Sequence, residues 1–229
     1  MAITRIKICG ITRCEDAVAA AELGADAIGL NFVGGPRRIS FEDAFKITRE
    51  LGPLVTAVGL IACHPRKYPD AATHSQVIKN RPRLPIHTFQ CYGYGDGPGD
   101  FLDGDDDSSV WMVRAISDRE SLRRAIEAVK GLYPRRPGAV VLDAASDKLG
   151  GSGRTFDWNW IAEARAAGEL DGVPPIILAG GLRPENVAEA IRIARPYAVD
   201  VSSGVEVSGK PGVKDRVKIR DFVEAVRGA

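Results

Sequence analysis

A cysteine and an aspartate stand where the proton-transfer groups of an enzyme could stand, each at the end of a short apolar run. Cys9 ends the run Arg5–Cys9, and Asp143 ends the run Ala139–Asp143. Side chains alternate between the two faces of an extended strand, so Cys9 shares its face with Lys7. A thiol and a carboxyl that face one cavity can act as a pair, one giving a proton and the other taking one.

Each of these residues also has a plainer interpretation. A cysteine is often a small apolar core residue, and an aspartate at a strand end often braces the next turn. To act as a base the thiol has to ionise, although its ordinary pKa is about 8.5. We therefore expect a cation close to Cys9, and we predict that Lys7 supplies it while paired with Asp200 on an adjacent strand.

Two glycine-bearing turns have the composition of a phosphate site. Glycine lets backbone N–H groups approach an anion closely, and a helix that starts there adds its positive end. Two ordinary tight turns would look the same, but the pair follows the last two apolar runs, where a barrel binds phosphate. The residues expected at this site are Gly180, Gly181, Ser202, Ser203 and Gly204. A third glycine cluster, at 150–153, is typical of a mobile loop over a site.

Two neighbouring arginines, Arg37 and Arg38, precede a helix start at Ser40. A guanidinium there can hold a substrate carboxylate through two parallel hydrogen bonds. One of the two arginines is expected to be an ordinary surface residue.

The elements that must position these groups are eight short β-branched runs that alternate with helical stretches. Alternating strands and helices predict a parallel sheet, and eight repeats favour a closed barrel over an open doubly wound sheet. Active sites of such barrels lie at the carboxyl ends of the strands. The expected strands are Arg5–Cys9, Ala27–Phe32, Val55–Ile61, Ile86–Cys91, Trp111–Ile116, Ala139–Asp143, Pro175–Ala179 and Ala198–Ser202.

Several helices have recognisable ends. The first is expected over Thr12–Leu23, stopped by Gly24, and Pro184 suits the first position of a later one. Ser117 with Glu120 is typical of a capping box. From residue 65 to 109, glycines and aspartates leave too few apolar positions for an amphipathic helix, so we expect the fourth helix to be irregular or vestigial.

The composition fits one soluble domain that spans residues 1–229. The chain is 45% hydrophobic and 27% charged, and its 31 basic residues nearly balance its 30 acidic ones, which argues against a nucleic-acid partner. No apolar run reaches the roughly 20 residues that cross a bilayer, and the start is too polar for a signal peptide. We therefore expect a cytoplasmic protein. Its cysteines and histidines lack paired spacing, so no metal is expected.

Five motifs, taken together, resemble phosphoribosylanthranilate isomerase. They cover both ends of the chain in order and are long enough to be specific. The motifs are Lys7-Ile8-Cys9-Gly10-Ile11-Thr12, Pro36-Arg37-Arg38-Ile39-Ser40, Leu142-Asp143 with 150–158, Ala179-Gly180-Gly181-Leu182 with 184–187, and Val199-Asp200-Val201-Ser202-Ser203-Gly204-Val205-Glu206.

The resemblance implies a single-domain (β/α)8 TIM barrel that performs an Amadori rearrangement in tryptophan biosynthesis. It makes Cys9 the general base and Asp143 the general acid. It gives Arg37 a contact to the anthranilate carboxylate and places Asp200 near the reacting centre. The implied partner is a small phosphosugar, with no cofactor and no metal, and the protein is expected to be a monomer or a homodimer.

The chain departs from the family pattern in one strand. Family members usually end the fourth strand in Gln-Leu-His-Gly, whereas this chain has Gln90-Cys91-Tyr92-Gly93. Two other functions stay open. One is a sugar-phosphate isomerase of histidine biosynthesis, which uses an aspartate where Cys9 stands. The other is a barrel that keeps phosphate binding without catalysis.

Overall fold

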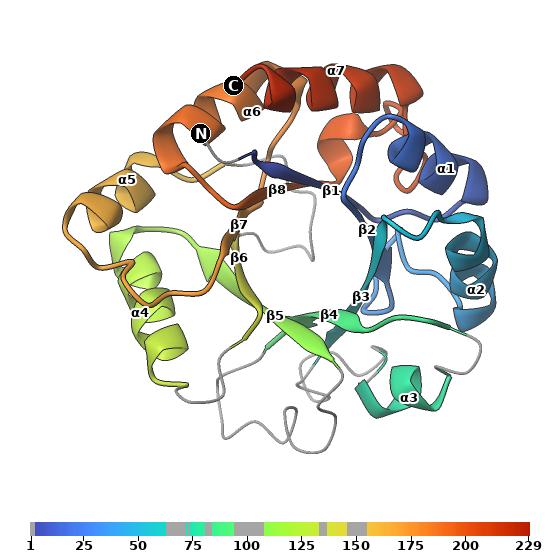
Figure 1. The fold of residues 1–229 in the computed structure, drawn as a ribbon, viewed down its shortest axis with the longest axis horizontal. Coiled ribbons are helices and arrows are strands. Elements are labelled where there is room, and N and C mark those ends of the chain that lie inside the picture. Colours follow the sequence, from blue (N-terminus) through green and yellow to red (C-terminus); the bar gives the residue numbers. More distant parts are fainter. Residues whose placement is uncertain are drawn as a thin grey trace.

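The computed structural model describes residues 3–62, 72, 74–80, 84–93, 108–132, 137–145 and 155–229. These residues form one closed barrel of parallel strands in the order β1 to β8, surrounded by helices (Figure 1). The strands are β1 Arg5–Cys9, β2 Ala27–Asn31, β3 Thr56–Ala62, β4 Thr88–Tyr92, β5 Ser109–Ile116, β6 Ala139–Ala144, β7 Ile176–Leu178 and β8 Ala198–Val201. The predicted closed barrel is confirmed, and every strand end lies within two residues of its expected position.

The helices lie outside the ring of strands (Figure 1). They are α1 Cys14–Glu22, α2 Phe41–Glu50, α3 His74–Lys79, α4 Arg119–Lys130, α5 Asn159–Ala166, α6 Pro184–Ala194 and α7 Arg216–Arg227, with a short 3₁₀ turn η1 at Ser203–Val205. The helix labelled α4 follows β5. The irregular helix expected after β4 falls mostly on residues 94–107, which lie outside the described residues, as does the glycine cluster at 150–153.

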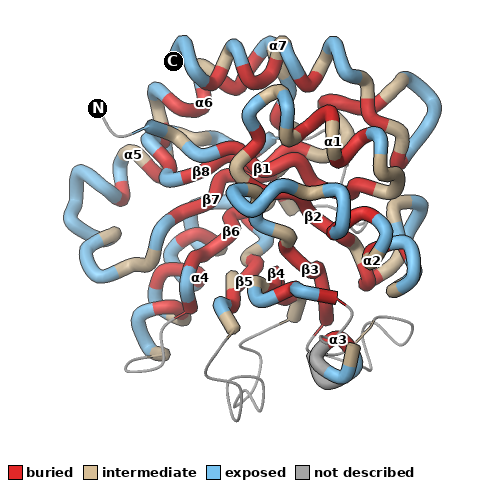
Figure 2. Tube along the Cα trace, turned by 45° about the vertical axis from the view of Figure 1, so that its right-hand side comes forward, coloured by how far each residue is buried: buried red, intermediate tan, exposed pale blue. Residues whose placement is uncertain are grey.

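Alternation along each strand separates an outer core from the barrel interior. Ile6 and Ile8 of β1 pack with the helices, as do Val140 and Leu142 of β6. Figure 2 shows the strands as the buried centre of the molecule and the helices as exposed on their outer sides. The faces predicted for the first and sixth strands are therefore confirmed, and the interior face of β1 carries Lys7 and Cys9.

The helix starts agree with the sequence in two cases and differ in one. Ser40 caps α2 by accepting a hydrogen bond from the backbone of Asp43 at 3.0 Å, and Pro184 is the first residue of α6. The capping box expected at Ser117 is wrong by one residue. Asp118 caps α4 instead, because its carboxylate accepts from the Ser121 N–H at 2.7 Å while the Ser121 hydroxyl accepts from the Asp118 N–H.

Candidate active site

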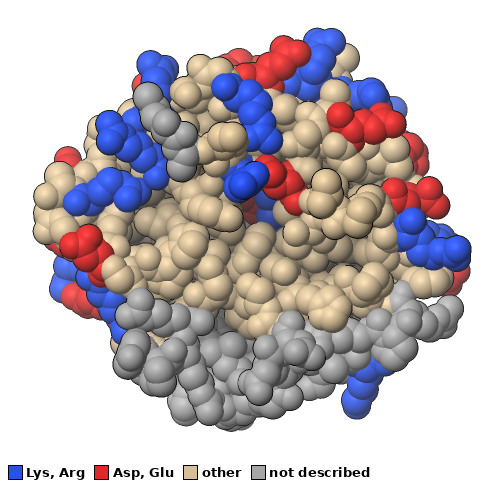
Figure 3. Space-filling view, in the orientation of Figure 1, with Lys and Arg blue, Asp and Glu red and all other residues tan. Residues whose placement is uncertain are grey.

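A cavity opens at the carboxyl ends of the strands and encloses about 740 Å³, part of it open to solvent. The space-filling view down the barrel is hollowed near its centre, with basic and acidic side chains next to each other at the upper edge of the hollow (Figure 3). Of the nine site residues expected from the sequence, all but Gly204 line this cavity. Those eight are Cys9, Arg37, Asp143, Gly180, Gly181, Asp200, Ser202 and Ser203.

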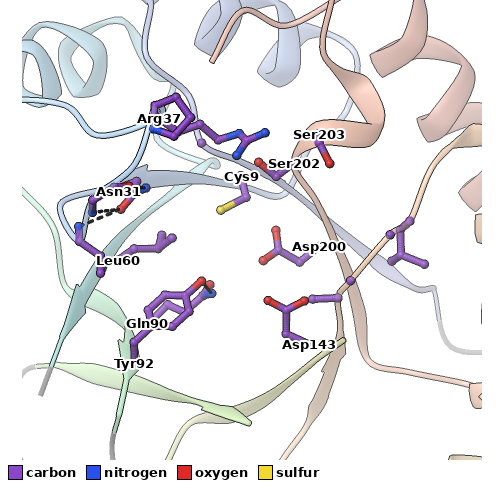
Figure 4. Close-up of a pocket in the computed structure, with 18 residues that line it drawn as sticks. Cys9, Asn31, Arg37, Leu60, Gln90, Tyr92, Asp143, Asp200, Ser202 and Ser203 are labelled. Carbon is purple, nitrogen blue, oxygen red and sulfur yellow. Dashed lines mark hydrogen bonds between the residues drawn. The ribbon is translucent and has the colours of Figure 1, made fainter. Parts of the chain in front are cut away.

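Cys9 and Asp143 come from different sides of the barrel and reach the same space (Figure 4). Cys9 ends β1 and is 8% exposed, whereas Asp143 is the fifth of the six residues of β6 and is partly buried. The thiol and the carboxyl point into the cavity with the carboxylate of Asp200 between them (Figure 4). The convergence predicted from strand alternation is therefore present.

Lys7 lies one layer below Cys9 inside the barrel and pairs with Asp200. Register between β1 and β8 sets these two residues side by side, and the Lys7 Nζ to Asp200 Oδ2 distance is 2.6 Å. Burial alone would lower the pKa of Lys7, but the charges of Asp200 and then of Cys9 raise that pKa above its ordinary value. The amine is therefore held charged next to the thiol.

The ammonium of Lys7 does not by itself ionise the Cys9 thiol. Burial raises the pKa of Cys9 above its ordinary value, and the carboxylate of Asp200 raises it further, while Lys7 and Lys214 lower it. The cation expected from the sequence is present, but the opposing effect of burial was not predicted. This raised pKa keeps the thiol protonated at physiological pH.

Gly29 of β2 leaves space for the Cys9 sulfur and the Lys7 nitrogen. A Cβ at this position would lie 2.7 Å from the Cys9 sulfur and 3.2 Å from the Lys7 nitrogen. Contacts between a Cβ and heavy atoms are not that short in a relaxed packing. The absence of a side chain in β2 thus lets the amine and the thiol occupy the same part of the barrel interior.

Asp143 has the electrostatic character of a proton donor. Burial raises its pKa to about 6, with a further contribution from Asp200, whereas Lys7 and the backbone N–H of Ala144 act in the opposite direction. A carboxyl with such a pKa keeps a sizeable protonated fraction near neutral pH, which is the property that a general acid requires.

Arg37 lines the cavity, whereas Arg38 is exposed. Of the two neighbouring arginines, Arg37 is therefore the one that can contact a ligand in the cavity. The Arg37 guanidinium forms two hydrogen bonds to Glu206, from Nε to Oε1 at 2.7 Å and from Nη2 to Oε2 at 2.8 Å. An arginine has five N–H donors, so three remain for a ligand. Figure 4 shows the guanidinium at the cavity edge above Cys9.

The two glycine turns meet at one side of the cavity. Gly180 and Gly181 both have positive φ, at 89° and 61°, which favours glycine. A Cβ on Gly204 would collide with the carbonyl of Leu182, so Gly204 lets the turn after β8 pack closely against the turn after β7. Gly204 therefore shapes the site although it does not line it.

Glu206 and Lys214 are buried residues near this site whose contacts were not predicted from the sequence. Glu206 is 6% exposed and Lys214 is 4% exposed. The only available signal was that Glu206 ends one of the family-like motifs, because the segment that brings Lys214 back to it has no regular periodicity. Within the described residues, no group of three or more His, Cys, Asp or Glu side chains could hold a metal ion.

Tyr92 occupies the wall opposite Asp200, with Gln90 beside it (Figure 4). The Gln90 amide donates to the Tyr92 hydroxyl at 3.2 Å, and both residues line the cavity. Burial and then the charge of Asp143 raise the pKa of Tyr92 well above its ordinary value, so its hydroxyl keeps its proton. The residue that replaces the family histidine thus brings a neutral O–H group to this wall.

A family model and a curated relative both match this chain and carry the same enzyme name. A family model described as N-(5'phosphoribosyl)anthranilate (PRA) isomerase matches residues 112–225. A curated N-(5'-phosphoribosyl)anthranilate isomerase from Acidithiobacillus ferrooxidans is 43% identical over all 229 residues and over its own full length.

Solved structures agree with the sequence comparison. Phosphoribosyl anthranilate isomerase from Thermotoga maritima has a TM-score of 0.79 and 35% identity, over 99% of this chain and 100% of that one. A phosphoribosyl anthranilate isomerase in complex with reduced 1-(o-carboxyphenylamino)-1-deoxyribulose 5-phosphate has a TM-score of 0.76 and 33% identity, with the same coverage. Both similarities extend across the whole barrel.

Proposed function

Because this chain belongs to the N-(5'-phosphoribosyl)anthranilate isomerase family, we propose that Cys9 and Asp143 transfer the protons of that family's reaction. The chain is an isomerase of tryptophan biosynthesis. It converts N-(5-phosphoribosyl)anthranilate to 1-(2-carboxyphenylamino)-1-deoxyribulose 5-phosphate by an Amadori rearrangement. The assignment of its residues to individual steps is our proposal.

Asp143 is the general acid of the first step. Its protonated carboxyl donates to the ring oxygen of the ribose, the C1′–O bond breaks, and the ring opens to a protonated Schiff base. The pKa of about 6 supports this role because the carboxyl is protonated in part of the molecules at neutral pH.

Cys9 is the general base of the second step. Its thiolate removes the proton from C2′, and the electron pair moves towards the Schiff-base nitrogen to give an enolamine. The enolamine becomes the ketone when the proton of its C2′ hydroxyl is replaced by one at C1′. The Lys7 ammonium favours the thiolate, whereas burial and Asp200 oppose it. A protonated Schiff base beside the sulfur adds the positive charge that the thiol needs to ionise.

The anionic ends of the substrate are bound at the cavity edge. We assign the phosphate to the turns that contain Gly180, Gly181, Ser202, Ser203 and Gly204, and the anthranilate carboxylate to Arg37. Three guanidinium donors remain beyond the two held by Glu206. Asp200 lies between the two proton-transfer groups, and its charge raises the pKa of both.

The observation that carries the proposal is the single cavity shared by a thiol, a carboxyl of raised pKa and two adjoining glycine turns. The test is turnover by the purified protein. Enzymatically generated phosphoribosylanthranilate is added, and the loss of its fluorescence is followed. Turnover supports the proposal. Turnover only of the corresponding substrate of histidine biosynthesis, or substrate binding without turnover by a well-folded protein, would contradict it.

The proposal also covers the cellular location and the oligomeric state of the protein. No helix in the described ranges is long and apolar enough to cross a membrane. We propose that the protein acts in the cytoplasm, where a reducing environment keeps the Cys9 thiol free to act as a base. We further propose that it works as a monomer or a homodimer on a small phosphosugar, without a cofactor or a metal.

A further inference from the structure

A buried ion pair lies behind the wall of the cavity, outside the residues that line it. The Lys214 amine is 3.1 Å from Glu206 Oε1, and the Lys214 side chain is fully buried. Its other partner is the backbone carbonyl of Ser202, at 3.0 Å. A lysine is seldom buried unless it is paired, and here one of its hydrogen bonds goes to the turn after β8.

The hydrogen bond from Lys214, with a longer one of 3.5 Å from the Val205 N–H, holds the Ser202 carbonyl and so the direction of a peptide group that faces the cavity. The carbonyl of Ser202 and the N–H of Ser203 belong to one planar trans peptide, so they point in opposite directions. Because the carbonyl points back to the Lys214 amine, the Ser203 N–H points forward, towards the cavity that Ser203 lines. Among the described residues this N–H donates to no backbone carbonyl. A positive charge on the carbonyl side also polarises the peptide and strengthens the N–H as a donor.

The turn after β7 is fixed in a similar manner. The Asn186 side chain donates to the carbonyl of Gly181 at 3.0 Å, which turns the Leu182 N–H of the same peptide the other way. In each turn, a side chain outside the cavity binds the carbonyl of a peptide group, and the N–H of the same peptide group points towards the cavity. Lys214 differs from Asn186 in bringing an amine whose pKa burial lowers and the charge of Glu206 raises.

Glu206 connects this arrangement to Arg37. Its carboxylate accepts two hydrogen bonds from Arg37, one from Lys214 and one from the backbone N–H of Gly212 at 3.0 Å. The Arg37 bonds come from the loop after β2, and the others come from the segment after β8. One carboxylate thus joins the two loops to which the proposed function assigns the opposite ends of the substrate.

We propose that Lys214 and Glu206 are positioning residues for substrate binding. Lys214 orients the Ser202–Ser203 peptide towards the substrate phosphate, and Glu206 holds Arg37 with its free donors towards the carboxylate. This inference rests on the proposed function for the identity of the ligand. A pair that only stabilises the fold would change the melting temperature of the protein, whereas a positioning pair changes affinity in the folded protein.

The first test uses Lys214→Met, which keeps the length of the side chain without charge or donor. The probe is inorganic phosphate, with its Kd measured by calorimetry on the folded protein. We expect the Kd to rise by about tenfold, as the loss of one well-oriented charge-assisted donor predicts. The KM for phosphoribosylanthranilate should rise by a similar factor, and the Kd for phosphate reports binding without any contribution from the proton-transfer steps. Lys46→Met is the matched control, because Lys46 pairs with Glu42 on the exposed face of α2.

The second test uses Glu206→Gln, which nearly preserves shape and also serves if Lys214→Met does not fold. Its amide cannot accept both Arg37 hydrogen bonds, so the guanidinium loses its fixed orientation. We expect KM to rise by about tenfold and the Kd for anthranilate, measured directly, to rise with it. Glu120→Gln is the matched control, since Glu120 accepts two hydrogen bonds from Arg123 on the exposed surface of α4.

Two results would overturn the inference. One is a folded Lys214→Met protein whose Kd for inorganic phosphate and KM both equal the wild-type values. The other is a folded Glu206→Gln protein with unchanged KM and unchanged Kd for anthranilate. A wild-type protein without isomerase activity would contradict the proposed function. The Kd values of the variant and wild-type proteins can still be compared in that case, because binding measurements need no turnover.

Discussion

Lys7 Nζ and Asp200 Oδ2 are 2.6 Å apart in the interior of the barrel, although the two residues are 193 positions apart in the chain. Both side chains are nearly inaccessible to water. Removing two charges from water is costly, and an apolar pair of similar volume often stabilises a protein as well or better. The pair lies next to Cys9 and close to Asp143, where its charges shift both pKa values. Its position therefore indicates an electrostatic role in the reaction.

The first prediction concerns the titration of Cys9. Lys7→Met removes a positive charge that lowers the pKa of the thiol, so this pKa should rise and alkylation by iodoacetamide at pH 8 should slow. Asp200→Asn removes a charge that raises the same pKa, so alkylation should become faster. The rate is measured at the Cys9 peptide by mass spectrometry. The partly buried Cys14 serves as the internal control, and equal rates at Cys9 in all three proteins would refute the assignment.

The second prediction concerns stability and pH. The pKa of Asp143 is raised from 3.8 to about 6 in the folded protein, so the fold binds this proton more tightly than the unfolded chain does. The folded state is therefore penalised as pH rises from about 4 to about 7. Asp143→Asn should raise the free energy of unfolding at pH 8 by about 1 to 3 kcal/mol and should have little effect at pH 4.

Denaturant unfolding at the two pH values measures the Asp143 effect. Asp171→Asn, at an exposed position, is the control for the loss of a carboxylate. An Asp143→Asn protein whose gain in stability is the same at pH 4 and pH 8 would show that the carboxyl is not perturbed.

The third prediction concerns Gly29. An alanine there would place its Cβ 2.7 Å from the Cys9 sulfur, so the sulfur or the strand has to move. We expect Gly29→Ala to lower kcat by about 10- to 100-fold through misplacement of the base. Gly52→Ala is the control, because a Cβ at Gly52 meets no atom within 4 Å. Steady-state kinetics of a folded Gly29→Ala enzyme with normal kcat would contradict this account of the barrel interior.

The fourth prediction concerns Tyr92. Tyr92→Phe removes the acceptor of the Gln90 amide, and the Gln90 Oε1 atom is already buried without a partner. Leaving the amide N–H groups unpaired as well should lower the free energy of unfolding by about 1 to 3 kcal/mol. The kcat should stay within about tenfold of wild type, because Tyr92 is assigned no proton transfer. A loss of kcat as large as that of Cys9→Ala would give Tyr92 a catalytic role.

Strand alternation explains why part of the site could be predicted from the sequence. A period of two places Lys7 and Cys9 on one face, and barrel closure brings β8 beside β1, which together predict the Lys7–Asp200 pair. Loops have no such period. The sequence could not separate Arg37 from Arg38, which differ because Glu206 holds only Arg37.

The contacts that were missed depend on chain segments far from any regular element. Lys214 reaches Ser202 because the residues after η1 fold back on the barrel, with Asp215 N–H bonded to the Val205 carbonyl. The error at α4 is of a different kind. Ser117 and Asp118 are both good capping residues, and the choice between them is decided by the hydrogen bond to Ser121.

The most direct test of the account is kcat for Cys9→Ala and Asp143→Asn, measured beside the Kd of each variant for inorganic phosphate. Removal of a base or an acid should lower kcat by several orders of magnitude, while the Kd stays at the wild-type value because the phosphate turns are intact. If either variant keeps a kcat within about tenfold of wild type, that residue does not transfer a proton in the reaction and the proposed mechanism is contradicted.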